Sequence, residues 1–400
     1  MKKILSKLCG GVLLCALSMS LTSCEGALDD ILGEWSRPTP GSSTGGGTTT
    51  IAVTSVTLDA DEMTLAVGDK GQLNITDVAP ADATDKTVSW SSNKEAIATV
   101  EATGLVTAVG AGTAIITATA NDGSGVKATC TVTVLPEGTL AGVFSVSGTD
   151  KVRFSKGNLQ AKIASYASNI ATASEWKFVD SQYSYIGNAA GNNSFAVDSW
   201  VDLFSWVGAS ADNDTYGLIT FTSSTHDYHG DVASESLKTD WGKLAISNGG
   251  NTANSGWRTL TSAEWTYLFN GRTSVTTLYC KATVNSMSGV VLFPDSYTHP
   301  EGVTPPASTN TTNAAFTTNT WSSDDWSKME AAGCVFLPAA GYRKGNTIHG
   351  VDSYGYYWSS SSHDLTLGYA NYVFFDSGYL EPNSSDRDFG FSVRLVRPVE

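Results

Sequence analysis

Residues 129–134 read Thr-Cys-Thr-Val-Thr-Val, an alternation of polar and apolar side chains with a period of two. Successive side chains of a β-strand point to opposite faces of its sheet. We therefore expect Cys130, Val132 and Val134 on the buried face of a strand and the threonines on its outer face. Similar short runs, separated by turn residues at regular spacing, fill residues 51–135, and this pattern predicts an all-β sandwich.

A second run in the same segment, residues 87–92, reads Thr-Val-Ser-Trp-Ser-Ser, and its alternation turns Val88 and Trp90 toward the core. The order of runs along residues 51–135 resembles a bacterial Ig-like group 2 domain. The runs that carry this resemblance are Val56-Thr57-Leu58, Leu65-Ala66-Val67-Gly68-Asp69, Val88-Ser89-Trp90-Ser91-Ser92, Ala98-Thr99-Val100, Gly104-Leu105-Val106-Thr107-Ala108 and Gly112-Thr113-Ala114-Ile115-Ile116. Domains of this family commonly act as spacers or stalks in surface proteins, so the resemblance implies a spacer.

A second domain is expected after Pro136-Glu137-Gly138, because residues 140–400 hold nine of the eleven tryptophans of the chain. Thr261 and Glu264 have the spacing of a capping box. Trp265, Leu268 and Phe269 follow on one face, and Gly271 is a stop signal. These residues predict a short amphipathic helix.

Another helix is predicted to open at Ser323, with acidic residues in its first turn, Trp326 and Met329 at helical spacing, and Gly333 at its end. Residues 335–338, Val-Phe-Leu-Pro, read as a buried strand. Long polar loops are expected over 187–256 and 297–320. The class predicted for this region is therefore α+β with much irregular structure.

Four motifs follow in order in the C-terminal region, and together they resemble the fibrobacter major paralogous domain family. The motifs are Gly256-Trp257-Arg258-Thr259-Leu260-Thr261-Ser262-Ala263-Glu264-Trp265, Val335-Phe336-Leu337-Pro338-Ala339-Ala340-Gly341-Tyr342-Arg343, Gly355-Tyr356-Tyr357-Trp358-Ser359-Ser360-Ser361 and Gly390-Phe391-Ser392-Val393-Arg394-Leu395-Val396-Arg397. That family is similar to C-type lectin-like folds, which include formylglycine-generating enzymes and ligand-binding proteins diversified by retroelements. The resemblance implies an α+β C-type lectin-like domain with long loops over residues 140–400.

The large residues of these motifs are expected to be structural. Trp257, Trp265 and Trp358 are interpreted as core aromatics, since burying a large ring is favourable without any ligand. The arginines are expected to hold loops through hydrogen bonds to carbonyl or carboxylate oxygens. These arginines are Arg258, Arg343, Arg394 and Arg397.

Ligand contacts are expected between the motifs, because in lectin-like folds the loops between the Trp-Ser-Ser element and the last strand form the exposed binding face. Tyrosine with Asn and Ser neighbours makes adaptable contacts at low entropic cost. The alternative interpretation is a solvated polar rim. The candidate ligand-binding residues are Tyr354, His363, Asp364, Tyr369, Tyr372, Asp376, Tyr379, Asn383 and Asp386.

The N-terminus has the pattern of a secretory signal, with Lys2 and Lys3 before an apolar core that is too short to span a bilayer. Leu21-Thr22-Ser23-Cys24 then matches the lipobox of bacterial lipoproteins. We expect residues 1–23 to be a signal peptide and Cys24 to be acylated. No later segment is apolar and long enough to serve as a transmembrane helix, so the lipid is the expected membrane anchor.

Residues 24–50 are expected to be a flexible tether, because their Gly, Ser, Thr and Pro content cannot bury a core. Loss of residues 1–23 would remove three lysines and no acidic residue, so the formal charge would fall from −15 to −18. So acidic a chain is not expected to bind nucleic acid.

Three cysteines remain in the region that should fold. Cys130 is interpreted as a small buried apolar residue, and Cys280 and Cys334 as either free thiols or one disulfide. Cys9 and Cys15 lie in the signal.

No metal site is predicted, with Ca²⁺ kept as the alternative. Glu381-Pro382-Asn383 matches a tripeptide of calcium-dependent lectins, but the Trp-Asn-Asp element of those lectins is replaced by Ser-Ser-Asp-Arg-Asp at 384–388. Asp212-Asn213-Asp214 lacks the later oxygen donors of an EF-hand. His226 and His229 lack a clear third ligand for zinc.

No catalytic residue is predicted. The chain has no Gly-x-Ser-x-Gly, His-Glu-x-x-His, Cys-x-x-Cys or phosphate-loop motif. The formylglycine-generating enzymes need a cysteine pair near the C-terminus, whereas this chain has no cysteine after Cys334.

The sequence therefore predicts an outer membrane lipoprotein, displayed at the cell surface, that presents a ligand-binding, adhesin-like head on an Ig-like spacer. The expected ligand is a glycan, a peptide or a host surface protein. The alternatives are a surface carbohydrate-active or modifying enzyme, or a structural envelope or pilus-like component. A periplasm-facing location is the alternative to surface display.

Overall fold

The computed structural model describes residues 49–167, 170–206, 241–364 and 368–399. Some of the residues singled out in the sequence lie outside these ranges, namely Cys24, the Asp212-Asn213-Asp214 run, His226 and His229. The described part of the chain is mostly β with few helices. None of its helices is both long and apolar enough to cross a bilayer.

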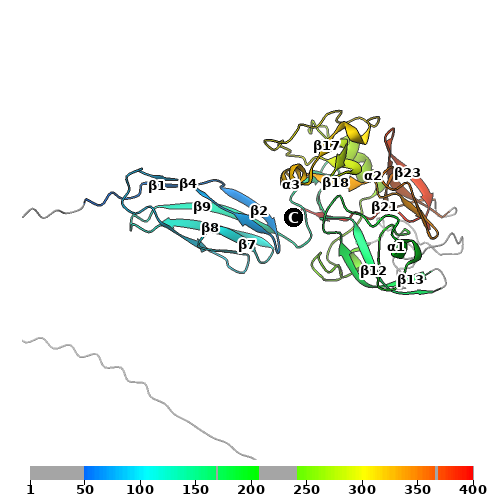
Figure 1. The fold of residues 1–400 in the computed structure, drawn as a ribbon, viewed down its shortest axis with the longest axis horizontal. Coiled ribbons are helices and arrows are strands. Elements are labelled where there is room, and N and C mark those ends of the chain that lie inside the picture. The colour runs from blue at the N-terminus through cyan, green and yellow to red at the C-terminus, as the bar shows by residue number, and fades with distance from the viewer. Residues whose placement is uncertain (1–48, 168–169, 207–240, 365–367, 400) are drawn as a thin grey trace, which may run out of the picture. The chain divides into compact units, whose positions relative to one another are not determined.

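The segment predicted to be a β-sandwich consists of nine strands and no helix. The strands are β1 (Ser55–Leu58), β2 (Glu62–Ala66), β3 (Lys70–Gln72), β4 (Ile75–Ala79), β5 (Val88–Ser92), β6 (Ala98–Val100), β7 (Leu105–Ala108), β8 (Gly112–Ala120) and β9 (Lys127–Leu135). They form a four-stranded sheet in the order β2-β9-β8-β5, a three-stranded sheet β3-β7-β6 and the pair β1-β4. Figure 1 shows these strands in blue and cyan.

The alternation of residues 129–134 is realised in β9. Cys130, Val132 and Val134 are buried in the sandwich core, and Thr129 and Thr131 are exposed. Val88 and Trp90 are half-buried and pack against the same core. The predicted strand parity is therefore confirmed for both runs, because each sheet has only one face covered by the other.

The C-terminal region adds fifteen strands in the described residues. They are β10 (Phe144–Ser145), β11 (Lys151–Phe154), β12 (Leu159–Ala167), β13 (Ile170–Phe178), β14 (Trp200–Val201), β15 (Tyr279–Val284), β16 (Met287–Leu292), β17 (Thr320–Trp321), β18 (Val335–Pro338), β19 (Tyr342–Lys344), β20 (Thr347–His349), β21 (Gly355–Asp364), β22 (Tyr369–Phe375), β23 (Leu380–Asp386) and β24 (Val396–Pro398). Their sheets have the orders β10-β11-β24, β13-β12-β14, β17-β15-β16-β18, β19-β20 and β21-β22-β23.

The helices of this region are short. They are α1 (Ala190–Ser194), the 3-10 turn η1 (Trp241–Lys243), α2 (Ser262–Thr266), the π-helical turn η2 (Tyr267–Gly271), the 3-10 turn η3 (Phe316–Thr318) and α3 (Ser323–Ala331). Most of the described residues of 187–256 and 297–320 are irregular, as their composition predicts. β18 is buried along its whole length, as predicted.

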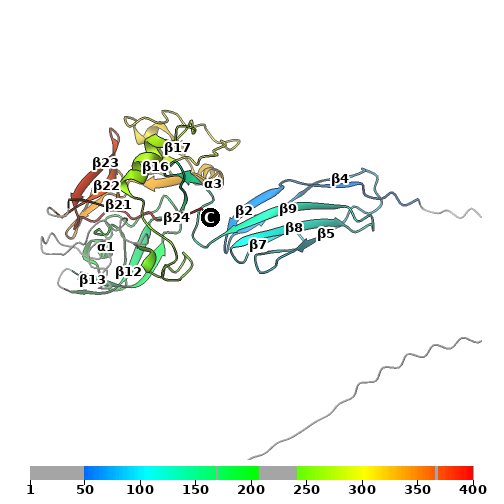
Figure 2. The ribbon, with the colours of Figure 1, turned by 180° about the vertical axis from the view of Figure 1, so that it is seen from behind.

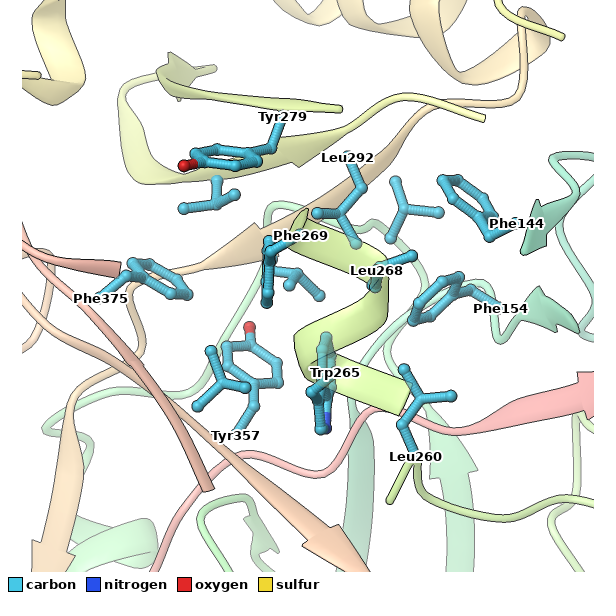
Figure 3. Close-up of a cluster of buried hydrophobic side chains, with 14 of the residues drawn as sticks. Phe144, Phe154, Leu260, Trp265, Leu268, Phe269, Tyr279, Leu292, Tyr357 and Phe375 are labelled. Carbon is cyan, nitrogen blue, oxygen red and sulfur yellow. The ribbon is translucent and has the colours of Figure 1, made fainter. Parts of the chain in front are cut away.

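The capping box at Thr261 is present. The Thr261 hydroxyl accepts a hydrogen bond from the Glu264 amide (3.1 Å), and the Glu264 carboxylate accepts one from the Thr261 amide (2.8 Å). The predicted apolar side chains of α2 and η2, Trp265, Leu268 and Phe269, are all buried. They lie at the centre of the cluster in Figure 3, which the side chains of β10, β11, β15, β16, β21 and β22 enclose.

α3 also begins with a capping box. The Ser322 hydroxyl accepts a hydrogen bond from the Asp325 amide, and the Asp325 carboxylate accepts one from the Ser322 amide, both at 3.1 Å. Trp326 and Met329 are buried, as their spacing predicts. The three described cysteines are all buried and free, so Cys280 and Cys334 are two thiols and not a disulfide.

The stretch from 355 to 386 differs from the prediction. Exposed loops were expected there, but the chain forms the antiparallel sheet β21-β22-β23, whose strands lie side by side in Figure 2. Hydrogen bonds between the three strands outweigh the low strand propensity of their Ser, Asn and Asp residues, because that propensity is weak beside the pairing of neighbouring strands.

Candidate functional site

The sheet β21-β22-β23 has two different faces. Alternation along the strands sends Tyr357, Val373 and Phe375 into the buried cluster of Figure 3. The opposite face carries the cross-strand pairs Tyr356 with Phe374 and Trp358 with Tyr372. This second face is the one that reaches the surface, because Tyr356 and Phe374 are only half-buried.

Five aromatic side chains form a continuous row on this surface, which we call the aromatic face. Its members are Tyr342, Tyr354, Tyr356, Phe374 and Phe389. Ring centroids are 5.0 Å apart between Phe374 and Tyr356, 5.2 Å between Tyr356 and Tyr342, and 6.0 Å between Tyr342 and Phe389. Tyr354 is 39% exposed and touches both Tyr356 and Phe374.

A buried layer of rings supports the aromatic face. Phe391 lies 4.8 Å from Tyr356, 4.7 Å from Tyr372 and 4.3 Å from Trp358, measured between ring centroids. The Trp358 indole N–H donates to the Phe204 carbonyl at 2.7 Å, so its one polar atom is satisfied in the core. Because these rings are fixed from below, the exposed rings above them are held in place before any ligand arrives.

Arg343 anchors the strand that supplies Tyr342. Its guanidinium is buried and donates to the carbonyl oxygens of Asn192, Asp202 and Leu203 and to the Asn192 side chain. Burial lowers the pKa of Arg343 to about 10, partly offset by Asp202. The role predicted for this arginine, holding loops through oxygen acceptors, is confirmed.

The other three motif arginines also bind oxygen acceptors. Arg258 pairs with Glu264, Arg394 donates to the Gln182 side chain, and Arg397 donates to the Ser255 carbonyl. Trp257, Trp265 and Trp358 are fully buried, so their interpretation as core aromatics is confirmed.

Tyrosine hydroxyls and carboxylates gather around the row of rings. Burial raises the pKa of Tyr356, and the nearby Tyr372, Tyr342, Tyr354 and Asp376 raise it further. Burial and the Glu381 carboxylate likewise raise the pKa of Tyr372. These phenols therefore stay protonated at neutral pH and can donate hydrogen bonds.

Tyr372 corrects the sequence prediction most clearly. It was expected on an exposed loop, but it lies inside β22 and is only 8% exposed. Its ring packs edge-on against Trp358 at 6.1 Å. It therefore belongs mainly to the layer beneath the aromatic face.

Two other candidates lie at the turn between β22 and β23. One Asp376 carboxylate oxygen accepts hydrogen bonds from the Gly378 and Tyr379 amides, at 2.6 and 2.8 Å. Tyr379 is 59% exposed. Asp376 therefore shapes the turn and presents Tyr379 to solvent.

Four of the remaining candidates lie away from the aromatic face. Asp364, Tyr369 and Asp386 are paired across the three strands at the far end of the sheet. β22 has seven residues, so its two ends are about 20 Å apart. His363 and Asp386 are exposed there, and Asn383 is exposed on β23. Asn383 lies between the two ends of the sheet, opposite Tyr372.

Sequence reasoning missed most of the aromatic face, namely Tyr342, Tyr356, Phe374 and Phe389. A signal was present for two of them, because Tyr354 and Tyr356, and likewise Tyr372 and Phe374, stand two residues apart as a shared strand face requires. The bridge between Arg343 and Gly390 brings Tyr342 and Phe389 to the aromatic face. No local sequence pattern indicates this long-range pairing.

Within the described ranges, no group of three or more His, Cys, Asp or Glu side chains is placed to hold a metal ion. Glu381, Pro382 and Asn383 are exposed on the edge strand β23. The Asn383 side-chain oxygen accepts a hydrogen bond from the Ser384 amide at 2.8 Å. The local geometry of the tripeptide is thus that of an edge strand.

Two segments of the chain match known family models. Residues 52–132 match the bacterial Ig-like domain (group 2), so this segment is an Ig-like domain as predicted. Residues 308–396 match a family described as a domain of unknown function (DUF8237). The second match contains every member of the aromatic face.

Curated relatives share a segment of about 85 to 90 residues with this chain. An Ig-like virion protein of Serratia phage KSP90 is 48% identical over 85 residues, which are 21% of this chain and 32% of that protein. An alpha-L-arabinofuranosidase of Bifidobacterium longum is 47% identical over 88 residues, 22% of this chain and 8% of the enzyme. The chain therefore spans a third or less of these relatives.

Solved structures show weak likeness. Domains 4 and 5 of the S-layer protein SbsC are 21% identical, with 21% of this chain and 53% of that chain covered and a TM-score of 0.18. An intimin mutant of EHEC O157:H7 is 20% identical, with 23% and 54% covered and a TM-score of 0.17.

Proposed function

We propose that the chain is an exported cell-envelope lipoprotein in which the Ig-like domain is a spacer and the C-terminal region is a ligand-binding head. In this proposal Cys24 carries the lipid, and residues 140–400 form a C-type lectin-like domain of the major paralogous family. The observation that carries the proposal is the aromatic face, a row of contacting rings that reach the surface together.

A contiguous exposed aromatic patch indicates binding better than scattered apolar residues do. Tyrosine rings are frequent at binding hot spots, since each gives a large contact area and a hydrogen-bonding group at low entropic cost. Here Tyr342, Tyr356 and Phe374 are held in β19, β21 and β22, so little ordering entropy opposes binding at these three rings.

The spacer role of the Ig-like domain is supported by the variety of proteins that contain it. Similar segments occur in a phage virion protein and in an enzyme named as an arabinofuranosidase, where they make up 32% and 8% of the chain. A module found beside such different partners is expected to position a neighbour rather than to determine its chemistry.

Export can be tested separately from binding. We expect radiolabelled palmitate to enter the native chain and not the Cys24→Ser variant. Protease added to intact cells should remove the C-terminal region. Labelling that persists in Cys24→Ser would contradict the anchor, and protection of the C-terminal region would contradict surface display.

Binding is tested on arrays of glycans and host matrix proteins, with and without Ca²⁺. Tyr354→Ala removes the most exposed ring of the aromatic face, and Tyr369→Ala is a matched tyrosine change at the other end of β22. We expect specific retention of one array component, lost in Tyr354→Ala and kept in Tyr369→Ala. If retention is lost only in Tyr369→Ala, the binding site lies at the far end of the sheet.

Two outcomes would favour the other functions considered. Turnover of an arrayed glycan would identify an enzyme, and two relatives are named as glycosidases, an alpha-L-arabinofuranosidase and a lacto-N-biosidase. They match this chain over about 90 residues at most. If the chain retains no component of the arrays, a role as a structural envelope component is favoured.

A further inference from the structure

The charges around the aromatic face are mainly negative. Glu381 is exposed and lies directly opposite Phe374 across β22 and β23, so its carboxylate is on the same side of the sheet as the rings. Asp352 is exposed two residues before Tyr354. Asp376 is close enough to raise the pKa of Tyr356. Glu381 and Asp376 therefore lie beside the row, and Asp352 is close to it in sequence.

These carboxylates are poorly neutralised within the described residues. None of the ion pairs found there includes Asp352, Asp376 or Glu381. Asp352 accepts a hydrogen bond from the Ser288 amide (2.6 Å), and Asp376 accepts two from its own turn. Asp376 also faces the buried Lys281, whose pKa it raises. Glu381 is thus the carboxylate of the face most available to a partner.

Among the described residues, the Lys344 ammonium shows how a cation fits on the row. The Lys344 ammonium lies 5.6 Å from the ring centre of Phe389, within the range of a cation–π contact. It occupies only the end of the row that is distant from Phe374. The rings of Tyr354 and Tyr356, which are nearer to Glu381, have no such contact among the described residues.

We propose that the aromatic face binds a positively charged segment of a partner protein, with Lys or Arg side chains lying on the rings of Tyr354 and Tyr356 on the side of the sheet that carries Glu381. This inference rests on the proposed function, namely that the face is the binding site. Exposed aromatic rings attract cations through their negative faces, and an uncompensated carboxylate beside them adds to that attraction.

The length of the row favours a peptide segment over a single amine. Ring-to-ring steps of 5.0, 5.2 and 6.0 Å connect Phe374, Tyr356, Tyr342 and Phe389, a path of about 16 Å that an extended segment of about five residues spans. One amino sugar or one lipid headgroup would cover only a single pair of rings. Several side chains of one segment can use the whole row.

The probe is a set of fluorescein-labelled nonapeptides that differ in the charge of their side chains. Lysine or arginine alternates with serine in two of them, and acetyl-lysine replaces lysine in a third of equal length. Fluorescence anisotropy of the whole chain is measured at 50 mM and at 300 mM NaCl. We expect the lysine and arginine peptides to bind at least tenfold more tightly than the acetylated peptide, and to weaken as salt screens the charges.

Variants separate the aromatic face from the general acidity of the chain. We expect Glu381→Gln and Tyr354→Ala each to weaken binding of the lysine peptide about two- to fivefold. This is the change in affinity that one exposed cation–π or charge contact gives. Glu301→Gln removes one exposed carboxylate far from the row in sequence, and we expect no change. Equal weakening by all three variants would show non-specific attraction and overturn the inference.

The inference and the proposed function can fail separately. Equal binding of the lysine and acetyl-lysine peptides would overturn the cationic ligand. If a neutral glycan is retained by the native chain and lost from Tyr354→Ala, the face is a binding site but its ligand class is wrong. If neither peptides nor array components depend on Tyr354, both proposals are wrong.

Discussion

The ion pair between Arg258 and Glu264 should be a main support of the C-terminal region, and its energy can be separated from that of the capping box. The two guanidinium nitrogens lie 2.7 and 2.6 Å from the two carboxylate oxygens. Arg258 is also bridged to Val396 through its backbone. The pair therefore joins the start of α2 to β24.

The geometry sets the expected magnitude. Both side chains are 16% exposed, between an exposed pair, which contributes about 0–1 kcal/mol, and a fully buried one, whose disruption costs about 3–5 kcal/mol. Glu264→Gln keeps an oxygen for the Thr261 amide but loses the charge, so we expect a loss of about 2 kcal/mol. Glu264→Ala also removes the capping contact, which increases the loss of stability by about 1 kcal/mol.

The assay is thermal unfolding of the whole chain followed by tryptophan fluorescence. Nine of the eleven tryptophans lie after residue 140, so the signal reports mainly on the C-terminal region. A loss of 2 kcal/mol corresponds to a Tm lower by about 4–8 °C for a region of this size. Glu301→Gln, an exposed carboxylate outside any ion pair among the described residues, is the control.

Two results would refute the reasoning. If Glu264→Gln unfolds within about 0.5 kcal/mol of the native chain, the pair contributes as little as an ordinary surface pair. If Glu264→Ala and Glu264→Gln are equally stable, the capping contact contributes nothing. We expect the native chain to be the most stable, Glu264→Gln to be less stable, and Glu264→Ala to be the least stable.

Three further predictions concern buried polar groups. Lys281 is buried with its ammonium donating to the Thr312 carbonyl, and burial lowers its pKa from 10.5 to about 8. Between about pH 8 and 10.5 the folded chain then binds fewer protons than the unfolded chain. Native stability relative to Lys281→Met should therefore rise across this range by up to about 1.4 kcal/mol per pH unit, and this gain is lost as the pH falls from 10.5 back to 8. A stability difference in urea unfolding that stays constant across the range would contradict this. The Asn319 side chain makes three hydrogen bonds, to the Lys281 carbonyl and to both backbone groups of Ala307, so Asn319→Ala should lose about 2–3 kcal/mol in the same assay, whereas Asn313→Ala, at an exposed position nearby, should lose almost nothing. Because burial raises the pKa of the Cys280 and Cys334 thiols, alkylation followed by peptide mass mapping should label them only after denaturation, and a linked peptide would reveal a disulfide.

Local patterns predicted local structure well. The alternation of residues 129–134 placed Cys130, Val132 and Val134 correctly, because a strand with one covered face leaves each side chain only two choices. The spacing of Thr261 and Glu264 predicted a capping box whose two hydrogen bonds are both present. In each case the partners are within a few residues, so the sequence contains the whole interaction.

The candidate site was predicted less well because its partners are distant in the chain. Residues 359–362 are four serines, a composition that favours a loop, yet they continue β21. Tyr372 looked exposed because its burial depends on Phe391 and Trp358, which no pattern around Tyr372 reveals. The candidate residues therefore lie mainly on this sheet and its turns, whereas most rings of the aromatic face were not among them.

In the proposed function, the support beneath the aromatic face would link binding to folding. Phe391 touches Tyr356, Tyr372 and Trp358 at once, and a core of this kind tolerates little change in volume without moving its neighbours. A site on free loops would accept changes beneath it, whereas rings fixed on a sheet pass any shift of the core to the surface. The binding strength of the aromatic face should therefore depend on residues that no ligand touches, and a binding defect in this region identifies a contact residue only when the unfolding free energy is unchanged.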